Sequence, residues 1–342
     1  MSEPIPATLP ILVSALALQN EGAAIAAAVQ ACTAGQRQVR WITDCDAATT
    51  PRTAEVAYIT RDVTAGSTKD MILPETERFY ATMRASPALA WVHTHSSGAD
   101  RYIFNEMRQR NVRVTTSTGT NAQPVAQTAL AAVLMLGRRF LDLLAAQRQR
   151  EWRPLLNHPD VHDLAGRTAM VVGLGPVGQE IARLLKAVGM GVIGVTRDTS
   201  AARHAGTLDA LCTYGEMASH LSRTDYLVLA CPLSPLTRHL VNARALALLP
   251  RGACVVNVAR GEVVAQAALI EALQTGHLGG AFLDVFEPEP LASDSVLWQL
   301  PNVMISPHTA GHFAEHAQRV HALFVHNLQR YLASQHLRHE SA

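Results

Sequence analysis

Residues 168–188 read TAMVVGLGPVGQEIARLLKAV and give the most specific indication of the fold. A short apolar strand runs into GLGPVG at 173–178, after which apolar residues recur at helical spacing. The first glycine allows a tight turn, the second lets the backbone approach a pyrophosphate, and the third lets helix and strand pack closely. A proline suits the first helical turn, whose free N–H groups attract phosphates. We therefore expect a dinucleotide-binding turn whose contacts are Gly173, Gly175, Pro176, Val177 and Gly178.

The next strand, 191–196, indicates which dinucleotide binds. An NAD site usually places a carboxylate about 20 residues beyond the glycines, where it binds the ribose hydroxyls. Here Thr196 and Arg197 stand at that point, and Asp198 comes two places late. Arg197 could pair with a 2′-phosphate, so we favour NADP(H) as the cofactor and keep NAD(H) as possible. The alternative is that Arg197 is a solvated loop arginine.

Apolar strand patterns alternate with helical patterns along the whole chain, which is typical of an α/β fold with parallel sheets. At 342 residues the chain is long enough for two domains. The expected strands are 10–15, 38–42, 55–60, 89–93 and 112–115 in the first third, then 168–172, 191–196, 226–230, 253–258, 280–285 and 303–306. Helical patterns cover 21–31, 75–85 and 101–109 in the first third and 312–335 near the end.

Residues 122–148 are rich in alanine and leucine and predict one long helix. Its apolar residues lie on most faces, so it must be covered on nearly all sides. We expect it to pack between domains or against a second subunit.

Polar side chains follow three strands of the second series where each strand ends. Strand 253–258 leads to Arg260, strand 280–285 to Glu289, and strand 303–306 to His308. Ligands bind outside the carboxyl ends of parallel strands, so we expect these side chains to converge beside the nicotinamide. Taken singly, the arginine could cap a strand, the glutamate could be a turn residue, and the imidazole is one of fifteen.

The three residue types fit the reduction of a 2-oxo acid. Arginine can hold the carboxylate in bidentate fashion and polarise the carbonyl. Histidine can donate a proton to the developing alkoxide, and a neighbouring carboxylate would orient the imidazole and favour its charged form. Arg260, Glu289 and His308 are therefore the candidate catalytic residues.

These motifs resemble the D-isomer-specific 2-hydroxyacid dehydrogenase family over roughly residues 89–330. The matching segments are GLGPVG at 173–178, ACPLSPLT at 230–237, VNVARG at 256–261, LDVFEPEPL at 283–291 and SPHTAG at 306–311. The resemblance implies a discontinuous, flavodoxin-like substrate-binding domain of residues 1–120 plus 313–342. It also implies a Rossmann-like dinucleotide-binding domain of residues 121–312.

The resemblance also assigns roles to single residues. Arg260 resembles the substrate-anchoring arginine and His308 the general acid/base, while Glu289, rather than Glu287, resembles the paired carboxylate. The backbone N–H groups of Ser97, Gly98 and Ala99 would bind the substrate carboxylate. Besides the glycine turn, the implied cofactor contacts are Thr196, Arg197, Pro232, Thr237, Val258, Ala259, Asp284 and Ala310.

The family implies an enzyme that transfers a hydride between NAD(P)H and a small 2-oxo acid, as a glyoxylate/hydroxypyruvate reductase does. Larger oxo acids remain open, as do the reaction direction and the roles of His93 and His95. The alternatives are a cofactor-sensing protein related to corepressors, and an NAD-linked phosphoglycerate- or formate-type dehydrogenase. A homodimer through residues 122–152 is also implied.

Composition excludes other classes of protein. The formal net charge of +1 gives no pull toward nucleic acid or membranes. The five cysteines form no CxxC pair, which indicates a reducing, cytoplasmic setting without disulfides or a metal site. Residues 9–18 could pass for a signal-peptide core, but a buried first strand fits them better because no basic residue precedes them.

Overall fold

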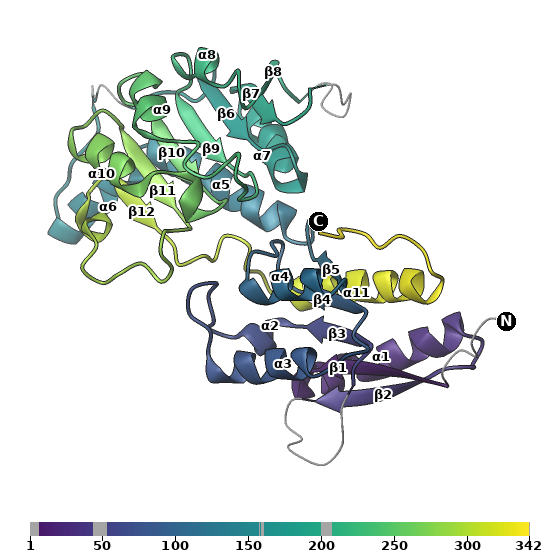
Figure 1. Cartoon of the computed structure of the whole chain (residues 1–342). Coiled ribbons are helices and arrows are strands. Elements are labelled where there is room, and N and C mark those ends of the chain that lie inside the picture. Colours follow the sequence, from purple (N-terminus) through teal and green to yellow (C-terminus); the bar gives the residue numbers. More distant parts are fainter. Residues whose placement is uncertain (1–6, 44–52, 157, 159–160, 200–206, 342) are drawn as a thin grey trace. The chain divides into compact units, whose positions relative to one another are not determined.

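The computed structural model describes residues 7–43, 53–156, 158, 161–199 and 207–341. The chain forms two compact units, shown in Figure 1. The described residues up to Thr120 and those from Phe313 onward form the first unit, and Asn121–His312 form the second. Cys45, one of the five cysteines that were expected to form no disulfide, lies outside the described residues.

The first unit contains a five-stranded parallel sheet, as the sequence predicts. The strands lie in the order β2-β1-β3-β4-β5, which is a flavodoxin-like order. Successive side chains of β1 point to opposite faces, so Leu9 and Ile11 enter one core and Leu12 enters the other. The strand bounds are β1 Thr8–Val13, β2 Gln38–Thr43, β3 Val56–Ile59, β4 Trp91–Thr94 and β5 Arg113–Thr116.

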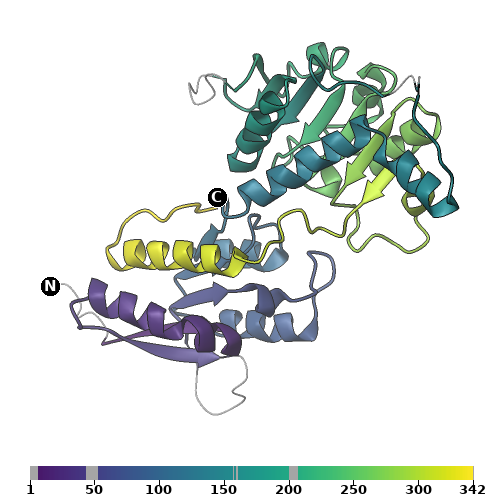
Figure 2. The ribbon, with the colours of Figure 1, turned by 180° about the vertical axis from the view of Figure 1, so that it is seen from behind.

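Helices cover both faces of this sheet (Figure 2). Helices α1 (Ala15–Cys32) and α11 (His316–Leu332) pack together on one face, where Phe324 stacks on Tyr58 at a centroid distance of 4.0 Å. Helices α3 (Pro74–Arg84) and α4 (Tyr102–Gln109) supply the apolar residues of the opposite face. The core between the sheet and helices α1 and α11 therefore contains side chains from both the first and the last described segments of the chain.

A segment after α11 pairs with the outer edge of β5. The Thr116 N–H donates to the His339 carbonyl at 3.1 Å, and the Ser341 N–H donates to the Val114 carbonyl at 2.8 Å. Arg113 forms two hydrogen bonds to the Glu340 carboxylate, at 2.9 and 2.8 Å. This segment therefore satisfies backbone groups that an edge strand would otherwise expose.

The second unit contains a seven-stranded parallel sheet in the order β12-β11-β10-β9-β6-β7-β8. The chain runs outward from β6 through β7 to β8, then returns to the other side of β6 at β9. This is the Rossmann order, and its switch point lies between β6 and β9. The bounds are β6 Thr168–Val172, β7 Gly191–Thr196, β8 Ala210–Thr213, β9 Tyr226–Leu229, β10 Cys254–Asn257, β11 Gly280–Leu283 and β12 Val303–Ile305.

The helices of the second unit also lie on both faces of its sheet (Figures 1 and 2). Helix α5 packs along α7 and against β10 and β11. Their bounds are α5 Ala122–Gly137, α6 Phe140–Gln149, α7 Pro176–Ala187, α8 Ala218–Leu221, α9 Ala243–Leu248 and α10 Gln266–Gln274. Among the described residues, no helix is long and apolar enough to cross a membrane.

The prediction of one long helix over 122–148 is wrong, because the helix breaks after Gly137. Arg139 adopts a left-handed conformation with φ of +56°, which starts α6 in a new direction. A Cβ on Gly137 would lie 2.6 Å from the Tyr226 hydroxyl, so α5 ends in close contact with the sheet.

Smaller differences also have local causes. The first strand ends at Val13 rather than 15, because the Ser14 hydroxyl accepts a hydrogen bond from the Ala17 N–H at 3.0 Å and caps α1. The last helix begins at His316 rather than 312. The short α2 (Arg61–Thr64) and β8 were not predicted.

Candidate active site

The turn between β6 and α7 has the geometry that its glycines predict. Gly173 has φ of +95°, and a Cβ there would lie 2.5 Å from the Cys231 backbone. A Cβ on Gly178 would lie 1.8 Å from the Gly173 carbonyl oxygen. Around Gly175, by contrast, a Cβ would meet no atom within 4 Å. Two glycines therefore shape the turn, and the third leaves open space above the backbone.

This open turn fits a dinucleotide pyrophosphate. Pro176 occupies the first turn of α7, and no acidic residue lies in that turn. The helix therefore presents its positive end and its unpaired N–H groups to the space above Gly175. The residues present fit the cofactor that the sequence predicts.

At the end of β7, Thr196 is half-buried and Arg197 is exposed. Burial raises the pKa of Tyr214 to about 12, and the nearby Arg197 charge opposes that rise.

The loop after β9 is held by a buried side chain. Thr237 is 2% exposed, and its hydroxyl donates to the Pro232 carbonyl at 2.7 Å. It also accepts a hydrogen bond from the Ser234 N–H at 2.8 Å. Thr237 therefore shapes this loop from within, while Pro232 is exposed on it.

Arg260 lies in a turn that Asn257 brackets at the end of β10. The Asn257 amide donates to the Arg260 carbonyl at 3.0 Å and accepts from the Ala259 N–H at 3.0 Å. Arg260 is half-buried, Val258 is half-buried and Ala259 is buried. A Cβ on Gly261 would lie 2.0 Å from the Phe286 carbonyl carbon and oxygen. The residue after Arg260 must therefore be glycine for the β10 turn to lie against the loop after β11.

Glu289 and His308 form a hydrogen-bonded pair from the loops after β11 and β12. Oε2 of Glu289 lies 2.9 Å from Nδ1 of His308, and Oε1 accepts from the Phe286 N–H at 3.1 Å. The Glu289 side chain is 8% exposed, whereas that of His308 is 51% exposed. A buried carboxylate thus holds one ring nitrogen, and the rest of the imidazole faces outward.

Glu287 is engaged elsewhere, which supports the choice of Glu289. Its carboxylate accepts from Arg238 at 3.1 Å and lies 3.0 Å from Nε2 of His239. Partial burial opposes the effect, but the hydrogen bonds and electrostatic interactions with His239 and Arg238 lower the pKa of Glu287.

Asp284 organises the loop that carries His308. Its carboxylate accepts hydrogen bonds from the Ser306 hydroxyl at 2.5 Å, the Thr309 N–H at 2.8 Å and the Ala310 N–H at 3.1 Å. Burial raises the pKa of Asp284, although these hydrogen bonds oppose the rise. The His308 N–H also donates to the Asp284 carbonyl at 2.8 Å, with φ of +54° at His308. Asp284 thus holds His308 in a left-handed backbone conformation. The sequence pattern did not predict this contribution.

In the first unit, the predicted substrate loop follows β4. Ser97, Gly98 and Ala99 are all half-buried. The structure pairs neither the Gly98 nor the Ala99 N–H with an acceptor among the described residues. Both N–H groups can therefore serve an external acceptor.

The buried His93 lies in β4 and the half-buried His95 directly follows it, and loss of solvent around the ring lowers the pKa of each to about 3. His93 is fully buried and contacts hydroxyls at both ring nitrogens, Thr115 at 2.8 Å and Ser117 at 3.1 Å. Nε2 of His95 lies 2.8 Å from the Thr64 hydroxyl. His93 is therefore a neutral structural residue at neutral pH.

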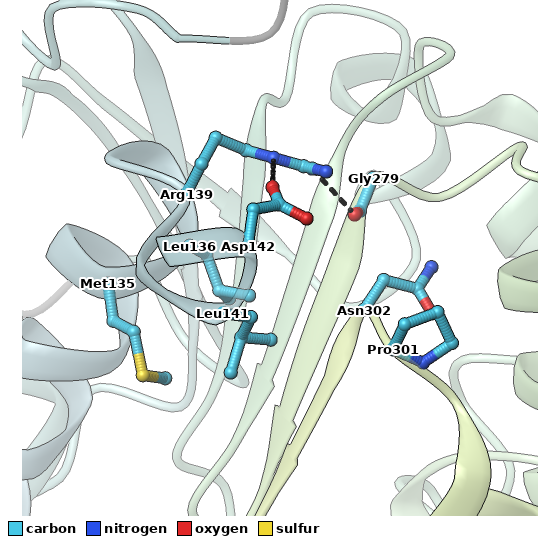
Figure 3. A pocket seen from close by; sticks show the side chains of 8 residues that line it. All are labelled: Met135, Leu136, Arg139, Leu141, Asp142, Gly279, Pro301 and Asn302. Carbon is cyan, nitrogen blue, oxygen red and sulfur yellow. Dashed lines mark hydrogen bonds and ion pairs between the residues drawn. The ribbon is translucent and has the colours of Figure 1, made fainter. Parts of the chain in front are cut away.

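A small pocket of about 10 Å³ is lined by residues of α5 and α6 and by residues that precede β11 and β12 (Figure 3). Arg139 pairs there with Asp142 at 2.6 Å and reaches the Gly279 carbonyl at 3.4 Å. Gly279 and Asn302 precede β11 and β12, so this pocket is separate from the candidate active site. Within the described chain, no group of three or more histidine, cysteine or acidic residues could hold a metal ion.

The glycine turn in a Rossmann-ordered sheet, with Arg260 and the Glu289–His308 pair beyond its strand ends, defines a nicotinamide-dependent dehydrogenase. A family model described as D-isomer specific 2-hydroxyacid dehydrogenase, NAD binding domain, matches residues 130–310. A glyoxylate reductase of Korarchaeum cryptofilum is 32% identical over 247 residues, which cover 71% of this chain and 73% of that protein. The chain belongs to the D-isomer specific 2-hydroxyacid dehydrogenase family.

Two solved structures are similar over 98% of this chain and 98% of their own. One is a D-isomer specific 2-hydroxyacid dehydrogenase from Xanthobacter autotrophicus in complex with NADPH and MES, with 29% identity and a TM-score of 0.75. The other is an NADPH-dependent glyoxylate/hydroxypyruvate reductase from Sinorhizobium meliloti in complex with NADP and sulfate, with 26% identity and a TM-score of 0.74. The predicted family, enzyme class and α/β fold are confirmed.

Proposed function

We propose that this protein reduces a small 2-oxo acid, with glyoxylate and hydroxypyruvate as the first candidates, to the matching 2-hydroxy acid, in the D configuration where C2 becomes a stereocentre. The observation that carries the proposal is the Glu289–His308 pair, with one ring nitrogen held at 2.9 Å and the imidazole half exposed. The names of the relatives support the choice of substrates.

Each catalytic side chain has a distinct role in this reaction. A bound nicotinamide supplies the hydride that the C2 atom of the substrate accepts. His308 donates the proton to the carbonyl oxygen, because its second ring nitrogen is available while Nδ1 faces Glu289. Glu289 orients the imidazole and stabilises its charged form. Arg260 holds the substrate carboxylate and polarises the carbonyl.

The loop Ser97–Ala99 supplies a second set of carboxylate ligands. The N–H groups of Gly98 and Ala99 would donate to a carboxylate oxygen, as neighbouring backbone N–H groups do in anion sites. The first unit is then the substrate-binding domain, and the second is the dinucleotide-binding domain.

NADP(H) is the preferred cofactor in this proposal. The exposed Arg197 follows β7 and would pair with the 2′-phosphate, and Thr196 offers no carboxylate to repel it. The complexes of the two similar structures with NADPH and NADP support this preference. The other proposed contacts are Pro232, Thr237, Val258, Ala259, Asp284 and Ala310.

We also propose a cytoplasmic homodimer formed through residues 122–152. Helix α6 exposes Phe140, Leu143 and Leu144, and Trp152 is 97% exposed. A contiguous set of exposed apolar side chains is typical of a subunit interface. A single-subunit mass by light scattering would contradict the dimer.

The test is oxidation of NADPH and of NADH across a panel of 2-oxo acids, with His308→Ala as the control. We expect turnover of glyoxylate or hydroxypyruvate with NADPH, and a loss of kcat in the variant. If no 2-oxo acid reacts while NADPH binds tightly, the protein is a cofactor sensor. Activity confined to a phosphoglycerate or formate would assign it to those dehydrogenases.

A further inference from the structure

Every carbonyl of the substrate loop Ser96–Ala99 accepts a hydrogen bond from the first unit. The donors, in order along the loop, are the Ser117 N–H at 2.9 Å, the Thr118 hydroxyl at 2.9 Å, the Ser96 hydroxyl at 2.7 Å and the Arg108 guanidinium at 3.4 Å. In a trans peptide the carbonyl and the following N–H point in opposite directions. The bond from Thr118 to the Ser97 carbonyl therefore turns the Gly98 N–H away from Thr118.

A second hydroxyl, that of Thr116, donates to the oxygen of the Thr118 hydroxyl. The Thr118 hydroxyl has one proton, which it donates to the Ser97 carbonyl. Thr116 lies 2.8 Å away, so its own hydroxyl must be the donor in the contact between the two. Successive hydrogen bonds in such a chain polarise one another, which strengthens the bond from Thr118 to the Ser97 carbonyl.

The backbone platform that carries these hydroxyls, residues Thr116 and Ser117, is held in place by burial and hydrogen bonds. Thr116 is buried at the end of β5, and its N–H is held by the His339 carbonyl. The fully buried Ser117 donates its hydroxyl proton to the Thr94 carbonyl at 2.9 Å, and its oxygen lies 3.1 Å from His93. Since the platform is fixed, the Thr118 hydroxyl decides the orientation of the Ser97–Gly98 peptide.

We propose that Thr118 is a positioning residue for the substrate carboxylate: through the Ser97 carbonyl it holds the Gly98 N–H in the orientation that receives the carboxylate. Thr116 supports it by donating a hydrogen bond to its hydroxyl oxygen. This inference rests on the proposed function of the loop. It adds residues from the end of β5 to the determinants of substrate affinity.

The test compares Thr118→Val with Thr118→Ser. Valine keeps the side-chain shape but loses the hydroxyl, and serine keeps the hydroxyl. For Thr118→Val we expect about a 10-fold rise in the KM for the 2-oxo acid and in the dissociation constant of oxamate, a carboxylate inhibitor of similar shape. The kcat should change by less than about 2-fold, because the loop binds ground state and transition state alike. The serine variant should match the wild type.

Two further variants act as controls. Thr116→Val should give a smaller rise, about 3-fold, because the Thr118 hydroxyl remains but loses its donor. Thr82→Val removes another hydroxyl of the first unit, which donates to the Arg78 carbonyl at 3.2 Å within α3, and should change neither constant. The dissociation constant of NADPH should be the same in all four variants.

Unchanged oxamate affinity in Thr118→Val would overturn the inference. An equal loss of NADPH affinity would also overturn it, because the substitution would then act through general damage. Failure of the proposed function would appear differently, as a wild-type protein that neither reduces a 2-oxo acid nor binds oxamate. Amide hydrogen exchange over residues 96–100 would then decide: we expect at least about 10-fold faster exchange in Thr118→Val, and equal exchange would refute the role of Thr118.

Discussion

Replacing Gly175 by alanine should separate cofactor binding from folding. The backbone of Gly175 has φ of −69° and ψ of −174°, which alanine adopts without strain, and an added Cβ meets no atom within 4 Å. The free energy of unfolding should therefore stay within about 0.5 kcal/mol of the wild type. If a pyrophosphate occupies the space above this residue, the methyl group blocks its close approach. A loss of about 1.4 kcal/mol would weaken NADPH binding tenfold.

Gly178→Ala is the matched comparison on the same turn. Its Cβ would lie 1.8 Å from the Gly173 carbonyl oxygen, so strand and helix must separate, at a cost of about 1–3 kcal/mol of stability. Urea unfolding and the quenching of protein fluorescence by NADPH measure the two effects on the same samples. An alanine variant of Gly175 that binds NADPH as well as the wild type would refute the placement of the pyrophosphate. A variant as unstable as Gly178→Ala would refute the open space.

Glu289→Gln should lower kcat about 100-fold, whereas Glu287→Gln should stay within about 2-fold, because the Glu287 carboxylate contacts Arg238 and His239 and not His308. Steady-state assays decide, and equal effects would contradict the assignment. Arg197→Ser should lower the preference for NADPH, measured as kcat/KM with NADPH divided by kcat/KM with NADH, about tenfold. An unchanged ratio would show that Arg197 does not contact the 2′-phosphate. Burial lowers the pKa of His93 to about 3, so the unfolded chain takes up a proton first as the pH falls below 6.5. This imidazole should remove about 2 kcal/mol of stability between pH 7 and pH 5, and unfolding of His93→Gln should show a correspondingly flatter dependence on pH; an equal slope would argue against burial of the neutral ring.

The strand–turn–helix unit at 168–187 was predicted almost residue by residue, because its signals are local. The apolar run, the glycine spacing and the helical periodicity all lie within about 20 residues. The Glu289–His308 contact was also expected, because both residues follow strand ends and the family resemblance singled out Glu289 as the partner of the histidine. The structure places the two side chains 2.9 Å apart.

Other features depend on contacts that no local pattern reveals. The helix breaks at Arg139, which has a positive φ, directly after Gly137 lies against Tyr226 of β9. The hydrogen bonds from Asp284 to the loop of His308 join the ends of two strands that are distant in the sequence. The sequence showed only that an acidic residue directly follows a buried strand. Thr118 offered no signal, because its role depends on the loop after β4 lying beside it.

The discontinuous first unit sets the order in which the protein can fold during synthesis. Its core needs Val320, Phe324 and Leu328 from α11, which leave the ribosome after the entire second unit. The first strands of the chain must wait with one sheet face covered by α1 but not yet by α11, while the uninterrupted segment 121–312 can complete its own core. Domains that fold as units during synthesis usually do so from the N-terminus, and here the unit translated in the middle can mature first. During synthesis, the strands of the first unit are thus exposed to aggregation until α11 has been made.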